Sequence, residues 1–338
     1  MGVTEPLVVG VDGGNSKTDV ALATSSGRVL GVVRGPGSSP DKLGDQEAAR
    51  VIGGLIRSAL AGADARETPV VAVSAFLAGL DLPEDAPRFQ AVLAPQWPDA
   101  RVRVENDVVA ALHAGTGGSP GVAVVCGAGI NAVGLGPAGQ RASFLSLGVR
   151  SGDWGGGLGL GRAVLWHAIR AEDGRGPRTR LAELTRRHFG VREVEEVAVS
   201  LQSGRIAELR LADLVEVLFR ADEEGDPVAV SLVVRLAEEV ASMTRVMLDR
   251  TALRGAAASV VLAGGVLTGG RPRLDTLIDD ALRRVDPTSR PVRLRVPPVA
   301  GALAHALPGG LPDVERSRLE QQWQDARRDP AAAEGVVT

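Results

Sequence analysis

The chain contains the same local pattern twice: an apolar run, a polar turn with two glycines, and a second apolar run. The first copy is VVGVDGGNSKTDVALAT, residues 8–24, and the second is GVAVVCGAGINAVGLG, residues 121–136. Short apolar runs bounded by turn residues predict buried strands, so each copy predicts a β-hairpin. Two such hairpins about a hundred residues apart predict two related domains. The alternative is coincidence, because this pattern is common in unrelated folds.

Both turns have a composition that suits a phosphate. Gly13 and Gly14 allow positive φ angles and leave backbone N–H groups uncovered. Asp12, at the end of the first strand, offers carboxylate oxygens to a hydrated divalent cation. The second turn repeats the glycines at Gly127 and Gly129, so two facing domains could hold one phosphate chain from both sides. The alternative for the first turn is an ordinary tight turn with a capping aspartate.

The order of the predicted elements gives an α/β protein of two domains and a tail. Strand and helix patterns alternate up to residue 117, whereas the later half is mostly helical until the apolar run ASVVLAGGVLTGG. We expect a first domain over 1–117, a second over 118–311 and a tail over 312–338. A final helix over 298–307 could instead pack back on the first domain. The tail is charged and then rich in alanine, and we expect it to be frayed and to have no catalytic part.

Composition excludes several classes of partner. A net charge of −3 and a pI near 5.9 argue against a nucleic-acid binder, which needs a basic face. The single cysteine, Cys126, excludes a disulfide framework and is consistent with a reducing cytoplasm. No apolar run is long enough for a membrane span, and we expect no signal peptide. A homodimer remains open.

Three further segments carry residues that could bind a ligand or take part in catalysis. In VENDVVAALHAG, Asn106 and Asp107 stand where a strand ends and a helix begins, a usual ligand site in open α/β sheets. Asp107 is either a general base for a substrate hydroxyl or a plain helix cap. In SGDWGGG, Asp153 could bind a polyol beside Gly152, or could cap a flexible loop. Trp154 is placed to stack on a sugar or to join the core.

The third segment, VVLAGGVL, carries Gly264 and Gly265 from a buried strand. Small residues there would let a flat purine lie against the backbone.

In order and spacing, these segments resemble the sugar kinases of the actin–hexokinase superfamily. More narrowly, residues 7–308 are similar to the BadF/BadG/BcrA/BcrD ATPase family, which includes N-acetylglucosamine kinase. GVDGGNSKT resembles its first phosphate loop, VENDVVAAL its catalytic aspartate segment and CGAGIN its second phosphate loop. SGDWGGG resembles its sugar loop, and LAGGV its adenosine strand. The resemblance implies two RNase H-like (actin-like ATPase) domains facing a nucleotide cleft, with closure on a sugar substrate.

The resemblance also implies roles for individual residues. ATP would be bound by Asp12, Gly13, Gly14, Asn15, Ser16, Lys17, Thr18, Gly127, Ala128, Gly129, Gly264 and Gly265. Mg²⁺ would be positioned by Asp12, and Asp107 would be the catalytic base. The sugar would be bound by Ser39, Asn106, Asp107, Asn131, Gly152 and Asp153.

The chain departs from the family pattern in three places. Cys126, Ala128 and Ile130 remove hydroxyls from the second phosphate loop, where backbone N–H groups could still bind a phosphate. Trp154 stands where the sugar loop usually has a glutamate, and Ser39 stands about where an asparagine helps to hold the sugar.

These observations lead to a first hypothesis and three alternatives. The first is an ATP-dependent kinase for the 6-hydroxyl of N-acetylglucosamine. The second is a kinase for glucosamine or another wall-derived sugar, and the third is a degenerate binding module that senses a nucleotide or a sugar. The family also contains activators that share one iron–sulfur cluster across a dimer. That cluster needs two cysteines per chain, and this chain has one.

Overall fold

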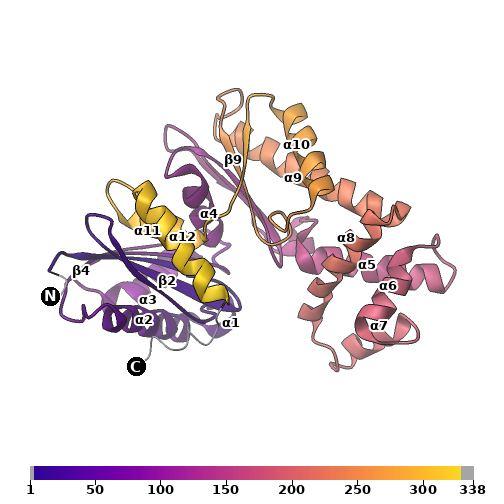
Figure 1. Ribbon diagram of the computed structural model, residues 1–338, viewed down its shortest axis with the longest axis horizontal. Helices are drawn as coiled ribbons and strands as arrows, with labels where there is room; N and C mark the ends of the chain where they lie inside the picture. The colour runs from indigo at the N-terminus through magenta and orange to yellow at the C-terminus, as the bar shows by residue number, and fades with distance from the viewer. Residues whose placement is uncertain (1–3, 329–338) are drawn as a thin grey trace. The chain divides into compact units, whose positions relative to one another are not determined.

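The computed structural model describes residues 4–328, and its contacts divide the chain into two compact units. The first unit consists of the described parts of Met1–Ala123 and Leu294–Thr338. The second unit is Val124–Arg293. Each unit contains a five-stranded sheet with helices packed on it (Figure 1).

The first unit begins with three strands and continues with alternating helices and strands. Its elements are β1 (Leu7–Gly13), β2 (Lys17–Thr24), β3 (Val29–Pro36), α1 (Pro40–Leu43), α2 (Asp45–Gly62), β4 (Val70–Leu77), α3 (Asp85–Leu93), η1 (Ala94–Gln96), β5 (Arg101–Asn106), α4 (Asp107–Thr116), α11 (Pro298–Ala306) and α12 (Asp313–Arg328).

The first sheet has the order β3-β2-β1-β4-β5. The pairs β1–β2 and β2–β3 are antiparallel, whereas β4 is parallel to both β1 and β5. Side chains alternate between the two faces, so β1 contributes to two cores. On one face Val9 packs with Ile52 of α2 and Phe89 of α3, and on the other Val8 packs with Leu303 of α11.

The two C-terminal helices correct the expected domain ends. Helix α11 belongs to the first unit, as the alternative packing of a final helix on the first domain allowed. The expected second domain, 118–311, therefore extends too far, because the second unit ends at Arg293. The expected boundary at 117 lies before β6, whereas this part of the first unit continues to Ala123. Residues 313–328 form helix α12 rather than a frayed tail, and its Leu319 is fully buried in the core beside α11. Residues 329–338 of the expected tail lie outside the described residues.

The second unit combines a sheet with a large helical part. Its elements are β6 (Gly121–Cys126, which begins in the first unit), β7 (Ile130–Leu135), β8 (Arg141–Ser143), η2 (Gly148–Ser151), α5 (Gly156–Glu172), α6 (Arg180–Phe189), α7 (Glu195–Gln202), η3 (Glu208–Asp213), α8 (Leu214–Glu223), α9 (Pro227–Arg250), β9 (Ser259–Ala263), α10 (Pro272–Val285) and β10 (Arg290–Arg293).

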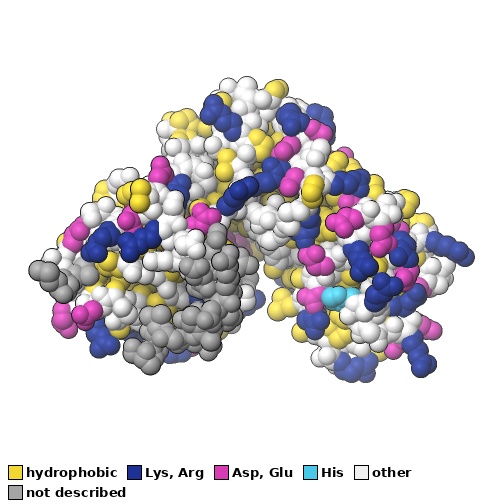
Figure 2. Space-filling model, viewed as in Figure 1, with side chains coloured by type: hydrophobic (Ala, Val, Ile, Leu, Met, Phe, Trp, Pro, Cys, Tyr) yellow, Lys and Arg dark blue, Asp and Glu magenta, His cyan; other side chains and the backbone are white. Residues whose placement is uncertain are grey.

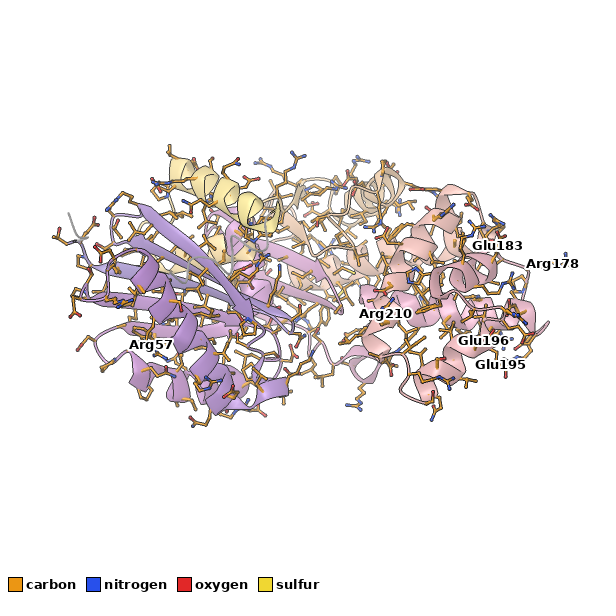
Figure 3. All side chains as sticks on the ribbon, turned by 60° about the horizontal axis from the view of Figure 1, so that its bottom comes forward. Arg57, Arg178, Glu183, Glu195, Glu196 and Arg210 are labelled. Atoms are coloured by element: carbon orange, nitrogen blue, oxygen red, sulfur yellow. The ribbon has the colours of Figure 1, made fainter. Side chains whose placement is uncertain are left out.

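The second sheet has the order β10-β9-β6-β7-β8. Strands β9 and β10 are parallel, and β7 and β8 are antiparallel. Helices α5, α6 and α8 pack on one another. In Figure 3, the labelled Glu183, Glu195 and Glu196 lie on the α6–α7 part of this unit, at a distance from its sheet.

The described surface carries charges of both signs (Figure 2). Within residues 4–328, none of the helices combines the length and the apolar character that a membrane span requires. On the face shown in Figure 2, basic and acidic side chains are interspersed over both units.

Candidate active site

The turn between β1 and β2 leaves backbone donors open. It is closed by a hydrogen bond of 2.8 Å from the N–H of Gly14 to the carbonyl oxygen of Lys17. Asn15 and Ser16 are exposed, and their N–H groups donate to no other backbone group among the described residues. Consecutive open N–H groups in a turn are a favourable site for an anion. We call residues 13–17 the first loop.

Two of the residues expected to bind ATP, Thr18 and Gly13, are packed inside the protein and support the first loop. Thr18 is fully buried, and its hydroxyl donates to the Ser38 hydroxyl over 2.8 Å. Gly13 is buried as well, and a Cβ atom there would lie 2.5 Å from Ser38 Oγ. The hydroxyl of Thr18 is therefore engaged inside the protein, and Gly13 is required by close packing.

Three charged side chains form a row across the first sheet. The strand register places Asp12 opposite Asp19, and Asp19 opposite Arg34. Asp19 is 2% exposed, and its two oxygens accept bonds of 2.6 and 2.9 Å from Arg34. Asp12 forms no such pair with a described residue. Burial, together with the charges of Asp19 and Asp107, raises the pKa of Asp12 to about 8.

Asp107 is not the cap of its helix. That role belongs to Asn106, whose Oδ1 accepts a bond of 3.1 Å from the N–H of Val108. The Asn106 amide nitrogen donates to the Leu80 carbonyl oxygen and to Asp81 Oδ1 over 3.1 and 3.0 Å. Asn106 thus holds the junction of β5 and α4. The carboxylate of Asp107, in the first turn of α4, is therefore not needed as the helix cap.

The surroundings of Asp107 give it the acidity of a general base. Desolvation, followed by the nearby charge of Asp81, raises its pKa from 3.8 to about 6, while N–H groups at the start of α4 oppose the shift. A base with a pKa just below neutral pH is ionised and still accepts a proton well.

Helix α11 connects the elements that carry the two aspartates. It packs on β1 at Gly10, where a Cβ atom would come within 2.4 Å of the Leu303 backbone nitrogen. It packs on α4 at Gly301, where a Cβ atom would lie 2.0 Å from the Ala110 carbonyl oxygen. These contacts allow no side chain at either glycine. They fix α4 and its Asp107 relative to β1 and its Asp12.

Ser39 is placed differently from what a sugar contact requires. It is 1% exposed, and its hydroxyl donates to the Ala78 carbonyl oxygen over 3.0 Å and to Asp41. These bonds join the start of α1 to the segment after β4. In the structure as it stands, the Ser39 hydroxyl does not reach solvent.

The turn between β6 and β7, residues 127–129, is held by the start of α5. The N–H of Gly157 donates to the Gly127 carbonyl oxygen over 2.7 Å, and that of Leu158 to the Ala128 carbonyl oxygen over 3.0 Å. A Cβ atom on Gly156 would lie 2.5 Å from the Gly129 backbone. The carbonyl oxygens of this second loop are thus used to cap α5. The N–H groups of Ala128 and Gly129 have no backbone partner among the described residues, so they are available to a phosphate.

Cys126 directly precedes this second loop, and its thiol is unreactive. It is fully buried, and burial raises the pKa of its thiol to about 12, against small opposite effects of the Gly156 N–H and Arg271. A neutral buried thiol is a poor nucleophile and a poor metal ligand. At this position Cys126 acts as a small apolar residue.

Three candidate sugar-binding residues lie in the second unit. Asp153 Oδ2 accepts bonds from the Gly148 N–H and the Ser151 hydroxyl, over 2.9 and 2.7 Å, which fix the carboxylate on its own loop. Gly152 has a φ of +83° with open space beside it. Asn131 accepts from the N–H of Ala132 over 2.7 Å, and its amide N–H₂ makes no bond to a described residue.

Trp154 already has a partner within its own unit. The guanidinium of Arg235, on α9, lies 4.2 Å from the centre of the indole ring. Such a contact is a favourable cation–π interaction. The indole therefore has one occupied face.

The turn after β9 joins the second loop through backbone packing. Gly264 has a φ of +86°, and a Cβ atom there would lie 2.4 Å from the Cys126 carbonyl oxygen. Gly265 has open space around it, as the expected purine contact requires.

Arg271 holds this turn, and sequence reasoning did not identify it. One guanidinium nitrogen donates to the carbonyl oxygens of Gly265 and Val266 over 3.2 and 3.4 Å. The other contacts Glu216, and the guanidinium carbon lies 4.1 Å from the centre of the Phe219 ring. One side chain thus fixes the backbone on which a purine would rest.

Other functional residues were missed because their signals are weak. Asp19 interrupts an otherwise apolar strand, and that interruption was a signal for a partner such as Arg34. Trp323 follows Leu319 by one helical turn in α12, so the spacing predicts a helix face. Nothing in the segment around Arg271 distinguishes it from the other arginines.

The donors of the first unit fit a magnesium ion. No cluster of three or more His, Cys, Asp or Glu side chains suited to a metal occurs among the described residues. Asp12, however, forms no ion pair with a described residue, and burial together with the charges of Asp19 and Asp107 destabilises its ionised form more than the charges of Lys17 and Arg34 stabilise it. Mg²⁺ is commonly held by one or two carboxylates, water and substrate phosphates, so a single aspartate is sufficient.

The two glycine-turn hairpins, each in a mixed five-stranded sheet, define the class as an α/β protein with two RNase H-like, actin-like units. The sequence model of the BadF/BadG/BcrA/BcrD ATPase family matches residues 9–306. The chain therefore belongs to this family, and ATP is its expected nucleotide.

Named relatives are distant. An N-acetyl-D-glucosamine kinase of Dictyostelium discoideum is 26% identical over 196 residues, which cover 54% of this chain and 60% of that protein. An N-acetylmuramic acid/N-acetylglucosamine kinase of Clostridium acetobutylicum is 26% identical over 261 residues, covering 77% of this chain and 85% of the relative. The match to the Dictyostelium protein thus spans less than two thirds of its length.

A solved structure supports the fold. The crystal structure of a candidate N-acetylglucosamine kinase from Chromobacterium violaceum has a TM-score of 0.70 and 24% identity. The match covers 88% of this chain and 98% of that protein.

Proposed function

We propose that the protein is an ATP-dependent kinase that transfers a phosphoryl group to the 6-hydroxyl of an amino sugar, with N-acetylglucosamine as the first candidate. Membership of an ATPase family and the names of two distant relatives support this assignment. The observation that carries it is Asp107, a carboxylate that is not needed as a helix cap and has a pKa of about 6.

In this proposal Asp107 accepts the proton of the sugar hydroxyl as that oxygen attacks the γ-phosphorus of ATP. The bond to the bridging oxygen breaks, and ADP leaves. Phosphoryl transfer of this kind depends mainly on positioning and charge stabilisation. The open N–H groups of Asn15, Ser16, Ala128 and Gly129 would bind phosphate oxygens. Asp12 would hold Mg²⁺, which supplies positive charge to the phosphates.

The sugar would be bound by the groups of its loop that are still open. Asp153 has a fixed carboxylate, Asn131 has an uncommitted amide, and Gly152 lets the backbone approach a ligand. Asn106 and Ser39 act differently in this proposal. Their hydrogen bonds are internal, so they position Asp107 and the segment after β4 rather than the sugar.

A degenerate binding module is the second candidate, and the observation that favours it is the altered second loop with Ala128 and Cys126. Such a module would bind ATP or a sugar without turnover. Glucosamine and other wall-derived sugars are the alternative acceptors for a kinase.

An ADP-release assay over about twenty sugars tests the proposal directly. We expect N-acetylglucosamine, or a related amino sugar, to give the highest kcat/KM, with ADP release dependent on the sugar. Turnover of only glucose or a non-sugar acceptor would refute the amino-sugar assignment. ATP binding with no sugar-dependent ADP release would favour the binding module.

A further inference from the structure

The C-terminal helix α12 is anchored to the first sheet along its length. At its start, the Glu315 carboxylate accepts a bond of 2.8 Å from the N–H of Val29 in β3. One turn later Leu319 is fully buried, and one turn after that comes Trp323. Figure 1 shows this helix in yellow, beside α11 and across strands of the first sheet. Three successive turns of α12 therefore place a tryptophan at a defined position on this unit.

Trp323 lies against the charged row beside the first loop. Its indole N–H donates to Asp19 Oδ2 over 3.4 Å, which adds a third donor to a carboxylate already bonded by Arg34. The Arg34 guanidinium carbon is 5.8 Å from the centre of the indole ring. The Lys17 ammonium nitrogen is 5.9 Å from the same centre. One indole thus lies beside two cations, Lys17 of β2 and Arg34 of β3, and bonds to the Asp19 carboxylate of β2.

Lys17 is the cation of this group that is available for a ligand. Arg34 is engaged by both oxygens of Asp19. Lys17 is exposed, directly follows the open N–H groups of the first loop, and forms no ion pair with a described residue. Its ammonium group lies over the Trp323 ring, an interaction that favours this position of the side chain.

We propose that Trp323 is a positioning residue for the first loop: it holds Lys17 beside the phosphate-binding backbone before the nucleotide arrives. The inference rests on the proposed use of this loop for ATP. A lysine side chain has several rotatable bonds, and ordering one on binding costs about 0.5–1.5 kcal/mol. Restraining it in advance removes part of that cost. The C-terminal helix then contributes to nucleotide affinity, although it supplies no group that contacts the reacting atoms.

The chain offers a direct chemical readout, because Lys17 and Lys42 are its only lysines and both are exposed. We would label amines with a limiting amount of an acetylating ester and measure the Lys17-to-Lys42 labelling ratio by mass spectrometry. The proteins compared are the wild type, Trp323→Leu, Trp323→Phe and the matched control Trp166→Leu. Trp166 is an exposed tryptophan in the second unit that contacts Arg170 in the same manner.

For Trp323→Leu we expect the labelling ratio to rise about two- to fivefold, the change that corresponds to a cation–π contact of 0.5–1 kcal/mol. Trp323→Phe keeps an aromatic face and should lie between Trp323→Leu and the wild type. Trp166→Leu should match the wild type. The KM for ATP should rise about two- to tenfold in Trp323→Leu, with kcat changed by less than about twofold. A merely structural role would lower activity through the amount of folded protein and leave KM unchanged.

Two results would overturn the inference. One is a labelling ratio that is the same in Trp323→Leu and the wild type. The other is a raised ratio in Trp323→Leu without any loss of affinity for a non-hydrolysable ATP analogue, measured by calorimetry. The calorimetric measurement does not need sugar turnover. A wild type that binds the analogue and phosphorylates no sugar would therefore refute the proposed function, while the comparison of variants still decides the role of Trp323.

Discussion

The two glycine turns are similar in sequence but differ in how the protein holds them. The first loop is supported by side chains: the Thr18 hydroxyl below it, and Asp12, Asp19 and Arg34 across its strands. The second loop is supported by backbone, since its carbonyl oxygens cap α5. The first loop therefore offers ionisable groups to a ligand, whereas the second offers backbone N–H groups.

Because of this difference, the unusual side chains of the second loop are compatible with the proposed phosphate binding. Ala128 and Cys126 remove hydroxyls, but the loop is shaped by Gly156 and Gly264, which pack on its backbone. Its N–H groups keep their direction whichever small side chain is present. The comparison predicts that changes near the first loop cost far more activity than changes in the second.

The largest expected effect comes from Asp107. Asp107→Asn should lower kcat by about 10²–10⁴, the usual contribution of a general base, and should leave ATP affinity nearly unchanged. Steady-state kinetics and calorimetry with an ATP analogue would measure both. Asp99→Asn, an exposed substitution with the same change of charge, is the matched control and should resemble the wild type. Activity of Asp107→Asn within tenfold of the wild type would remove this residue from the role of base.

The next effect is the pH dependence of kcat/KM at saturating Mg²⁺. The pKa of Asp107 is raised to about 6, and the ionised form is the base. Activity should therefore be half-maximal near pH 6, level off above about pH 7 and fall about tenfold per pH unit below about pH 5. The thiol of Cys126, with a pKa of about 12, should add no change between pH 6 and 9. An acidic limb centred near pH 4 would show that the carboxylate lies in a more polar environment.

A smaller effect is expected at Arg271, which supports the turn beside the second loop. Arg271→Ala removes two hydrogen bonds to carbonyl oxygens and should raise the KM for ATP about tenfold, at the scale of one or two net hydrogen bonds. Arg271→Lys should recover part of the loss, because a lysine can donate to one carbonyl group but cannot pack flat on Phe219. Arg284→Ala, an exposed substitution on the same helix α10, provides the control. Equal KM values in Arg271→Ala and the wild type would exclude a role in nucleotide binding.

The smallest effect is expected at Ala128. Ala128→Ser restores a hydroxyl and should lower the KM for ATP about two- to tenfold, the effect of one hydrogen bond. Ala138→Ser, in the exposed turn after β7, is a control outside the second loop. A gain in kcat of a hundredfold or more would show that the second loop, contrary to the comparison, limits catalysis.

The sequence predicted the parts of this fold that have strong local patterns. Both hairpins and the junction at Asn106 and Asp107 follow from apolar runs bounded by polar turns. Strand β3 was missed because its burial is only partial at most positions and its sequence includes two glycines. Helix α12 was missed because its buried face is narrow: Leu319 and Trp323 stand in a charged segment.

The site was predicted less completely, because a sequence does not show whether a polar side chain bonds to a ligand or to another group of the protein. Thr18 and Ser39 carry hydroxyls in expected binding segments, yet both are buried and bonded inside the protein. A glycine likewise shows that a side chain is excluded but not by what. At Gly156 and Gly264 the neighbour is the backbone of the second loop, rather than a ligand.

The central claim is that this chain moves the γ-phosphoryl group of ATP to the 6-hydroxyl of an amino sugar with Asp107 as the base. Phosphorus and carbon NMR of the products formed from ATP, Mg²⁺ and N-acetylglucosamine tests it most directly. The account predicts ADP and a sugar phosphorylated on the 6-oxygen in equal amounts, with formation at least about a hundredfold slower in Asp107→Asn. Phosphorylation at another oxygen, or ADP formed at the same rate without the sugar, would contradict it.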